Sequence, residues 1–360
     1  MVLHLTPPPP APPDRAQRLV LVQALRAIAA LFVVFLHAQY DAVHFAGPAG
    51  FAPLRALPWE VGVDIFFVIS GFVIVHATRG QFGRAGAAGG FLARRLIRIV
   101  PLYWLATGLF LLIAFVRPAA LNSPPPSGAD IAASFLFVPY VNSLGAVQPV
   151  LTLGWTLNYE MAFYLVFAAA MAAGLARART VLLVALFFCA LTALGFLVAL
   201  PMPLSFWANP MALEFVAGMG IALARDTGGR PGIIMRTVLA AAAIRMLHDD
   251  LTQDGVERAL ALGVPAAMLV MAAVFGPEPR MPAPLARALV LLGDASYALY
   301  LFHPFALRAT RLMFSDSGIG PASYIAIATV AAVVLAVAVH LAFERPVMRY
   351  LRGRLEKGRP

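Results

Sequence analysis

The feature that most constrains this chain is a series of long apolar runs that recur along nearly its whole length. Each run holds roughly 20 mostly apolar residues, which as a helix is enough to cross a hydrocarbon core about 30 Å thick. Hydrophobic residues make up 61% of the 360 and charged residues only 12%, whereas about a quarter of the residues in a soluble domain are charged. The sequence therefore predicts an all-α integral membrane protein.

Ten segments fit the sequence as transmembrane helices of a single bundle. Residues 1–18, which include a proline-rich tract, are predicted to be a disordered cytoplasmic tail, and residues 346–360 a basic cytoplasmic tail. Residues 19–345 then form one membrane domain. The ten predicted spans lie at about 19–39, 59–77, 97–116, 154–175, 180–200, 206–224, 232–247, 259–276, 287–308 and 322–343.

The basic residues predict the orientation of this bundle. All but one of the 27 are arginine. With the N-terminus in the cytoplasm, 20 of them fall on the cytoplasmic side and six on the external side, while Arg26 lies within the first span. This bias follows the positive-inside rule, so both termini are predicted to be cytoplasmic. It also explains the net charge of +10 without a nucleic-acid partner.

A further apolar stretch, residues 131–150, complicates the count of spans. It contains two prolines and Asn142. Counting it as a span would move Arg177 and Arg179 outside and invert every later loop. We therefore predict an external amphipathic or re-entrant segment here.

Arg26 and His37 are the first candidates for function, because a charge inside a bilayer costs about 2.5 to 3.5 kcal/mol on insertion scales. They lie 11 residues apart in the first span, which places them on one face with a rise of about 16 Å. A histidine that titrates near neutrality can take a proton from a hydroxyl attacking a thioester carbonyl. The arginine would hold an anionic part of the donor or orient the imidazole. The alternative is an interhelical hydrogen bond plus an interfacial arginine.

Two further spans carry polar candidates. Asp64 and Gly71 share one face of the second span, where glycine permits close helix approach. We favour a structural role for Asp64, with pairing to the arginine or histidine of the first span as the alternative.

Arg95 and Arg98 lie at i, i+3 on the cytoplasmic side of the third span. Guanidinium groups bind phosphates bidentately, so the nucleotide end of coenzyme A is expected to dock there. Plain interfacial anchoring is the alternative.

The fourth span opens with aromatic and acidic residues near the external side. Trp155 and Tyr164 suit both an interfacial belt and a platform for a saccharide ring. Glu160 shares a face with Tyr164 at i, i+4. Because anchoring does not explain a carboxylate there, we predict a site role for Glu160.

The ninth span places Ser296, Tyr300 and His303 on one helical stripe. These are candidates for acceptor or cavity residues, although a histidine satisfied by packing is the commoner case. The chain has no cysteine and histidine cluster with metal-ligand spacing and no glycine-rich phosphate loop with a lysine. We therefore predict no metal site and no permanently bound cofactor.

Taken together, these segments resemble acyltransferase family 3, the integral-membrane acyltransferases that modify bacterial exopolysaccharide, O-antigen, peptidoglycan and nodulation factors. The resemblance implies that residues 19–345 are an acyltransferase domain and that Arg26 and His37 are required for activity. It also implies that Arg95 and Arg98 bind the acyl donor. Within that family, the motif sequences are most similar to those of the exopolysaccharide acetyltransferase branch. The blocks that carry it are 25–37, 62–71, 95–103, 155–164 and 293–304, followed by 344–346.

The function implied is a membrane-bound O-acyltransferase of the bacterial inner membrane, with His37, Arg26 and Glu160 as catalytic residues. It would move an acetyl or related acyl group from cytoplasmic acetyl-CoA to a hydroxyl of an exported or cell-surface polysaccharide. Its partners would be acyl-CoA, a saccharide or lipid-linked glycan, the bilayer and the polysaccharide synthesis machinery.

Two questions stay open at this point. His37 is about 27 Å from the cytoplasmic end of the first span, a gap that an extended coenzyme A arm or a relay through a protein side chain would close. The alternative functions are a transporter or flippase of a lipid-linked saccharide, and an inactive scaffold for polysaccharide synthesis.

Overall fold

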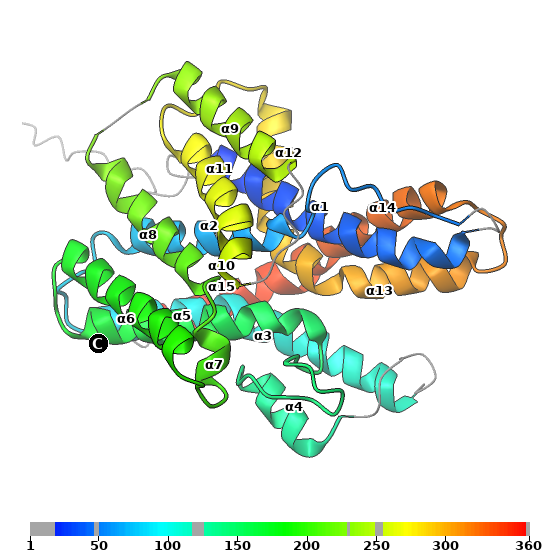
Figure 1. Ribbon diagram of the computed structural model, residues 1–360, viewed down its shortest axis with the longest axis horizontal. Helices are drawn as coiled ribbons and strands as arrows, with labels where there is room; N and C mark the ends of the chain where they lie inside the picture. Colours follow the sequence, from blue (N-terminus) through cyan, green and yellow to red (C-terminus); the bar gives the residue numbers. More distant parts are fainter. Residues whose placement is uncertain (1–18, 47–49, 117–125, 229–230, 249–254, 358–360) are drawn as a thin grey trace, which may run out of the picture.

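The computed structural model describes residues 19–46, 50–116, 126–228, 231–248 and 255–357, and every regular element in these ranges is helical (Figure 1). The predicted all-α class is therefore confirmed. The predicted tail at residues 1–18 lies outside the described residues. Most of the predicted basic tail at the other end belongs to a helix, α15.

The described residues form α-helices, two short 3₁₀ turns (η1, η3) and two π-helical turns (η4, η5). In chain order they are α1 (Val20–Ala42), η1 (Val43–Phe45), α2 (Val61–Thr78), α3 (Ala87–Val116), α4 (Gly128–Phe135), η3 (Thr152–Gly154), α5 (Trp155–Ala172), α6 (Arg177–Leu197), α7 (Leu204–Trp207), α8 (Ala212–Asp226), α9 (Ile233–His248), α10 (Gly255–Arg258), η4 (Ala259–Gly263), α11 (Val264–Val274), α12 (Ala283–Asp294), α13 (Ser296–Phe314), α14 (Pro321–Val339), η5 (His340–Glu344) and α15 (Arg345–Lys357).

Six stretches of helix in the described ranges are long and apolar enough to cross a bilayer, so the chain is a multi-pass membrane protein. They comprise α1, α2, α3, α6, α10 with α11, and α14 with α15. Together α12 and α13 make a seventh candidate, bent by 67° between its two halves. The other three predicted spans fall on α5, α8 and α9. Of these, α8 and α9 have only 15 and 16 residues, less than a perpendicular crossing needs. The count of ten stays a prediction.

The segment at residues 131–150 contains no helix of spanning length. Its only helix, α4, begins at a capping box in which Ser127 and Asp130 exchange hydrogen bonds of 2.9 and 3.1 Å. After eight residues the chain becomes irregular until η3. Eight residues rise only about 12 Å, so α4 does not cross a bilayer.

Helices α2 and α8 cross in direct backbone contact at two glycines. A Cβ atom added to Gly71 would lie 2.0 Å from the carbonyl oxygen of Phe215, and one added to Gly218 would lie 2.0 Å from that of Val68. Only a residue without a side chain fits at either position. The close approach predicted at Gly71 is confirmed, and it holds α2 against the centre of the bundle.

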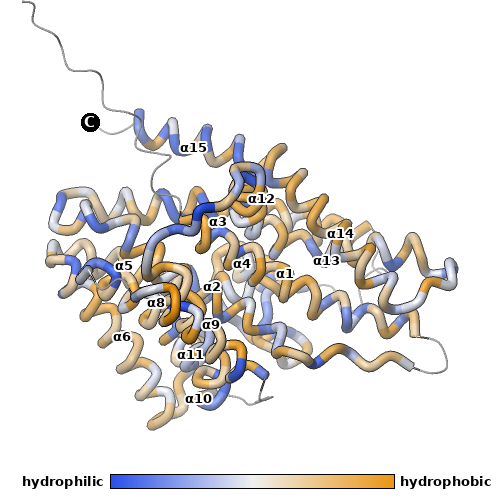
Figure 2. The backbone as a smooth tube through the Cα atoms, turned by 90° about the horizontal axis from the view of Figure 1, so that it is seen from above, coloured by the Kyte–Doolittle hydropathy of each residue, from blue (hydrophilic) through white to orange (hydrophobic). Residues whose placement is uncertain are grey.

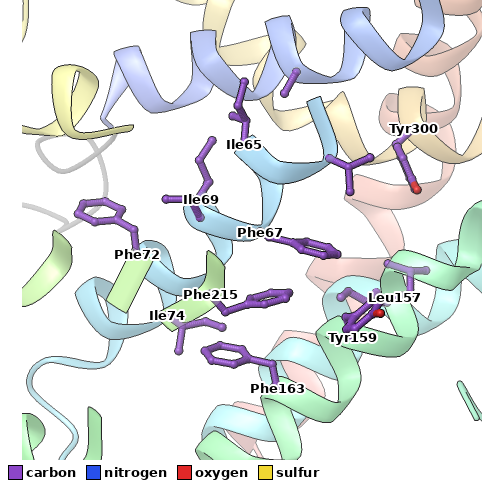
Figure 3. Packing of buried hydrophobic residues seen from close by; sticks show 14 of the residues in the cluster. Ile65, Phe67, Ile69, Phe72, Ile74, Leu157, Tyr159, Phe163, Phe215 and Tyr300 are labelled. Carbon is purple, nitrogen blue, oxygen red and sulfur yellow. The ribbon is translucent and has the colours of Figure 1, made fainter. Parts of the chain in front are cut away.

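Aromatic rings fill the core beside this crossing (Figure 3). Phe67 of α2 and Phe163 of α5 each stack on Phe215 of α8, with ring centroids 4.5 and 4.7 Å apart. On α6, in contrast, Leu186 and Leu197 are 58% and 78% exposed. Such apolar surface suits lipid and not water. Figure 2 shows the hydrophobic outer helices and the hydrophilic stretches of α15 at one edge.

Candidate active site

A cavity of about 150 Å³ lies among α1, α2, α3, α5 and α13, and we call it the inner cavity. Figure 3 shows three of its lining residues, Phe67, Leu157 and Tyr300, on three different helices. Motifs far apart in the sequence therefore converge here. The residues predicted from the sequence that line this cavity are Arg26, Arg95, Arg98, Glu160, Tyr164 and Tyr300.

Arg26 is held in the inner cavity by a chain of hydrogen bonds to α12. Its Nη1 donates to Oε1 of Gln23 at 3.0 Å, and Nε2 of Gln23 donates to Oδ1 of Asp294 at 3.1 Å. Gly293 lets the two helices approach, because a Cβ there would lie 2.5 Å from the carbonyl oxygen of Gln23. No spacing in the sequence points to Gln23, since a lone amide in an apolar run has no distinguishing pattern.

The arginine pair of α3 enters the cavity by two different kinds of contact. Arg98 forms an ion pair of 2.9 Å with Glu344, whose other oxygen lies 2.7 Å from Nδ1 of His340. The guanidinium of Arg95 lies over the ring of Tyr164, 5.9 Å from its centroid. The carboxylate thus fixes one arginine, and an aromatic face supports the other.

Glu160 contributes a carboxylate to the same cavity. The hydroxyl of Ser70 donates to its Oε1 at 2.8 Å, and the hydroxyl of Tyr164 donates to the same atom. Ser70 was not predicted as a site residue, although it precedes Gly71 in a motif that the sequence singles out. Three guanidinium groups against one lining carboxylate make the cavity electropositive, which suits an anionic ligand.

His37 borders a different and more open pocket of about 340 Å³, which we call the outer pocket. Asp41, one turn further along α1, accepts a hydrogen bond of 2.8 Å from Nη1 of Arg311 and another from the hydroxyl of Tyr324. The pocket therefore joins an imidazole to a fixed ion pair. Its lining residues are His37, Tyr40, Asp41, Pro304, Leu307 and Arg308.

Side chains of α13 separate the two spaces. The hydroxyl of Tyr300, which lines the inner cavity, donates to the carbonyl oxygen of Leu153 at 3.0 Å. One turn later, the fully buried His303 places its Nε2 3.1 Å from Nδ1 of His37. Arg26 and His37 therefore border different spaces, although their spacing places them on one helical face.

Four predicted residues are not among those that line either space, and His303, which contacts His37 from behind, is one of them. Asp64 forms a bidentate pair with Arg258, with distances of 2.8 and 3.1 Å. Trp155 packs edge-on against a neighbouring tyrosine ring. Ser296 donates to the carbonyl oxygen of Gly293 at 2.8 Å, where α12 bends into α13. Across the described ranges, no three His, Cys, Asp or Glu side chains group as metal ligands do.

Comparison with known proteins gives a consistent result. The model of a family described as an acyltransferase domain matches residues 21–341. The exopolysaccharide production protein ExoZ of Rhizobium meliloti (strain 1021) is 33% identical over 81% of this chain and 90% of its own. Acyltransferase MdmB of Streptomyces mycarofaciens is 28% identical over 95% of both chains. Peptidoglycan O-acetyltransferase OatA of Listeria monocytogenes is 28% identical over 41% of this chain and 23% of its own. No solved structure matches the chain.

Proposed function

Because this chain belongs to acyltransferase family 3, we propose that it moves an acetyl or related acyl group from cytoplasmic acyl-CoA to a hydroxyl of an exported or cell-surface polysaccharide. The observation that carries this proposal is the convergence of Arg26, Arg95 and Arg98 on one cavity, next to a separate pocket that holds His37. The likeness to an exopolysaccharide production protein supports the choice of acceptor.

The inner cavity suits the acyl donor, with acetyl-CoA as the expected substrate. Arg98 is fixed by Glu344 and Arg26 by Gln23, so two guanidinium groups are oriented before an anion arrives. Preoriented forks bind phosphate oxygens at a lower entropic cost than free side chains do. A cavity of about 150 Å³ admits only part of coenzyme A. Glu160 and its partner Ser70 would lie along the bound donor.

The outer pocket suits the acceptor and the chemistry. The acceptor hydroxyl gives its proton to His37 while its oxygen attacks the thioester carbonyl carbon. The carbon–sulfur bond then breaks, and His37 returns the proton to the departing thiolate. Along α1, His37 lies about 16 Å beyond Arg26. Direct transfer therefore requires a donor arm extended past Tyr300, which borders the inner cavity on that side.

We place the protein in the bacterial inner membrane with both termini in the cytoplasm and about ten spans. Whether the two termini lie on the same side of the membrane tests this arrangement. An even number of crossings returns the chain to its starting side, and an odd number does not. Reporter fusions at the two ends should therefore both report cytoplasm. A reporter that shows the C-terminus outside would favour seven crossings, with α12 and α13 acting as one bent span.

The direct test of function uses membranes that contain the protein, labelled acetyl-CoA and a polysaccharide acceptor. The expected result is label in the polysaccharide, lost in His37→Ala but kept in His248→Asn, a change at an exposed histidine. Full transfer by His37→Ala would exclude His37 as the base. Label that accumulates on the protein before it reaches the glycan would indicate a relay. If a deletion strain stopped exporting glycan while the residual glycan stayed acetylated, a transporter would be favoured.

A further inference from the structure

We propose that His303 is a positioning residue for the reaction: it accepts a hydrogen bond from Nδ1–H of His37 and so leaves the Nε2 lone pair of His37 free to take the acceptor proton. This inference rests on the proposed function, in which His37 is the base. It adds a residue that touches neither donor nor acceptor and acts through His37.

The contacts of His37 assign its proton. Its Nδ1 lies 2.9 Å from the carbonyl oxygen of Val33 and 3.1 Å from Nε2 of His303. A carbonyl oxygen only accepts hydrogen bonds, so the neutral ring carries its proton on Nδ1. That proton is shared between the two acceptors, and Nε2 of His37 is left with its lone pair.

The contacts of His303 agree with this assignment. Its Nδ1 lies 2.9 Å from the carbonyl oxygen of Tyr300 and 3.1 Å from that of Leu299. Both are acceptors, so this ring also carries its proton on Nδ1, and its Nε2 accepts. The 3.1 Å contact between the two rings therefore joins one donor to one acceptor. The opposite tautomer of either ring would point two protons or two lone pairs at each other.

The residue after His303 explains why Tyr300 offers its carbonyl. In an α-helix the N–H of residue 304 would donate to the carbonyl oxygen of residue 300, but Pro304 has no N–H. The freed oxygen of Tyr300 takes the Nδ1–H of His303 in its place. Pro304 thus frees the nearer of the two carbonyl oxygens that keep the proton of His303 on Nδ1, and the Nε2 of His303 joins the Val33 carbonyl in keeping the proton of His37 on Nδ1.

This arrangement is suited to a base that becomes charged during transfer. When Nε2 of His37 takes the acceptor proton, the ring becomes an imidazolium and its Nδ1–H bond to His303 becomes charge-assisted. In serine hydrolases a buried carboxylate orients the histidine. Here the orienting group is a neutral, fully buried ring, which avoids placing another charge inside the bundle.

Two amide substitutions that differ by one methylene test the proposal. The terminal oxygen of glutamine reaches the position of Nε2 of histidine, whereas that of asparagine reaches only the position of Nδ1. His303→Asn should lower kcat on the order of 10²-fold, with the KM for acetyl-CoA unchanged. His303→Gln should recover most of that loss, because it restores an acceptor opposite His37. Detergent gel filtration and thermal unfolding would show that both variants fold.

A third variant changes the contact between His303 and the carbonyl oxygen of Tyr300. Pro304→Ala restores the N–H that competes for the Tyr300 carbonyl, so kcat should fall several-fold with an intact helix. A wild-type kcat in folded His303→Asn would overturn the inference, as would a His303→Gln variant no better than His303→Asn. Full activity of His37→Ala would instead overturn the proposed function, so the two failures are distinguishable.

Discussion

The inner cavity and the outer pocket are neighbours in one bundle, yet they hold their polar groups by different means. In the inner cavity, Arg98 is held by the carboxylate of Glu344 and Arg26 by the amide oxygen of Gln23. In both contacts the arginine is the donor and its partner the acceptor. At the outer pocket, His37 meets the imidazole of His303 at 3.1 Å, and in the proposed arrangement both rings are neutral until a proton is transferred. The inner cavity thus holds permanent charges in place, and in the proposed mechanism the histidine of the outer pocket takes up and releases a proton.

This difference follows from the cost of charge in a low dielectric. An arginine buried without a counter-charge or hydrogen bonds is strongly unfavourable, so groups that bind an anion need partners already present. A base must be neutral before it acts, and the side chain in direct contact with His37 is an imidazole, while Asp41 of the same pocket is paired with Arg311. In the proposed mechanism donor binding is therefore separated from proton transfer, and the following variants test that separation.

The largest effect is expected at the outer pocket. His37→Ala should lower kcat by about 10²- to 10⁴-fold, the range for loss of a general base, while the Kd for acetyl-CoA stays at the wild-type value. Transfer of label and equilibrium binding of acetyl-CoA measure the two quantities separately. A Kd that rises as much as kcat falls would show that the two spaces act as one site.

The inner cavity should show the reverse pattern. Arg98→Ala removes a charge-assisted contact worth about 1.5 to 3 kcal/mol, so the KM for acetyl-CoA should rise by about 10- to 150-fold with little change in the KM for acceptor. Arg287→Ala, at an exposed arginine of α12, is the matched control and should leave both constants unchanged. If acceptor KM rose with donor KM, Arg98 would not belong to a donor site.

The position of α2 supports the inner cavity but not the outer pocket. Gly71→Ala forces a Cβ to within 2.0 Å of a backbone oxygen of α8, so it should destabilise the fold by about 1 to 3 kcal/mol, as overpacking does. Gly108→Ala, where a Cβ would meet nothing within 4 Å, should not lower the unfolding temperature, because alanine favours a helix more than glycine does. Equal unfolding temperatures in the two variants would contradict the crossing described for α2 and α8.

The smallest expected effect is at the partner of Arg98. Glu344→Gln keeps the shape of the side chain but removes its charge, so Arg98 stays present and is held less firmly. We expect the KM for acetyl-CoA to rise by about three- to ten-fold, less than in Arg98→Ala, because one ion pair weakens to a neutral hydrogen bond. A larger rise than in Arg98→Ala would mean that Glu344 itself contacts the donor.

Much of the candidate site was predictable because its residues stand out against an apolar background. Arg26 and Glu160 were predicted from their charge at membrane depth, and Arg95 and Arg98 from their i, i+3 spacing at the cytoplasmic side of a span. The structure brings all four to one cavity. The helical class followed from the same apolar runs. Ser70 was not predicted, although the motif that contains it was singled out, because a neutral hydroxyl carries no charge that marks it within that motif.

Partners across the bundle were not predictable, because contacts between distant segments leave no local pattern. Asp64 was expected to take a structural role or pair with the first span, and its partner is Arg258, which the spans had placed in an external connection. The bend of 67° between α12 and α13 was likewise not expected in a single ninth span. Each depends on which helix lies opposite, a property of packing and not of sequence period.

What this sequence determined by itself is the solvent of the chain and the candidates for its chemistry: apolar runs require lipid, and a few ionisable residues within them mark the candidate site. Only the tertiary structure decided that Arg26 and His37 border different spaces, and that a second histidine meets the first. The physical reason is that helical periodicity fixes the face of the helix on which a side chain lies. Which side chains and cavities that face contacts at each height along the helix axis depends on the neighbouring helices.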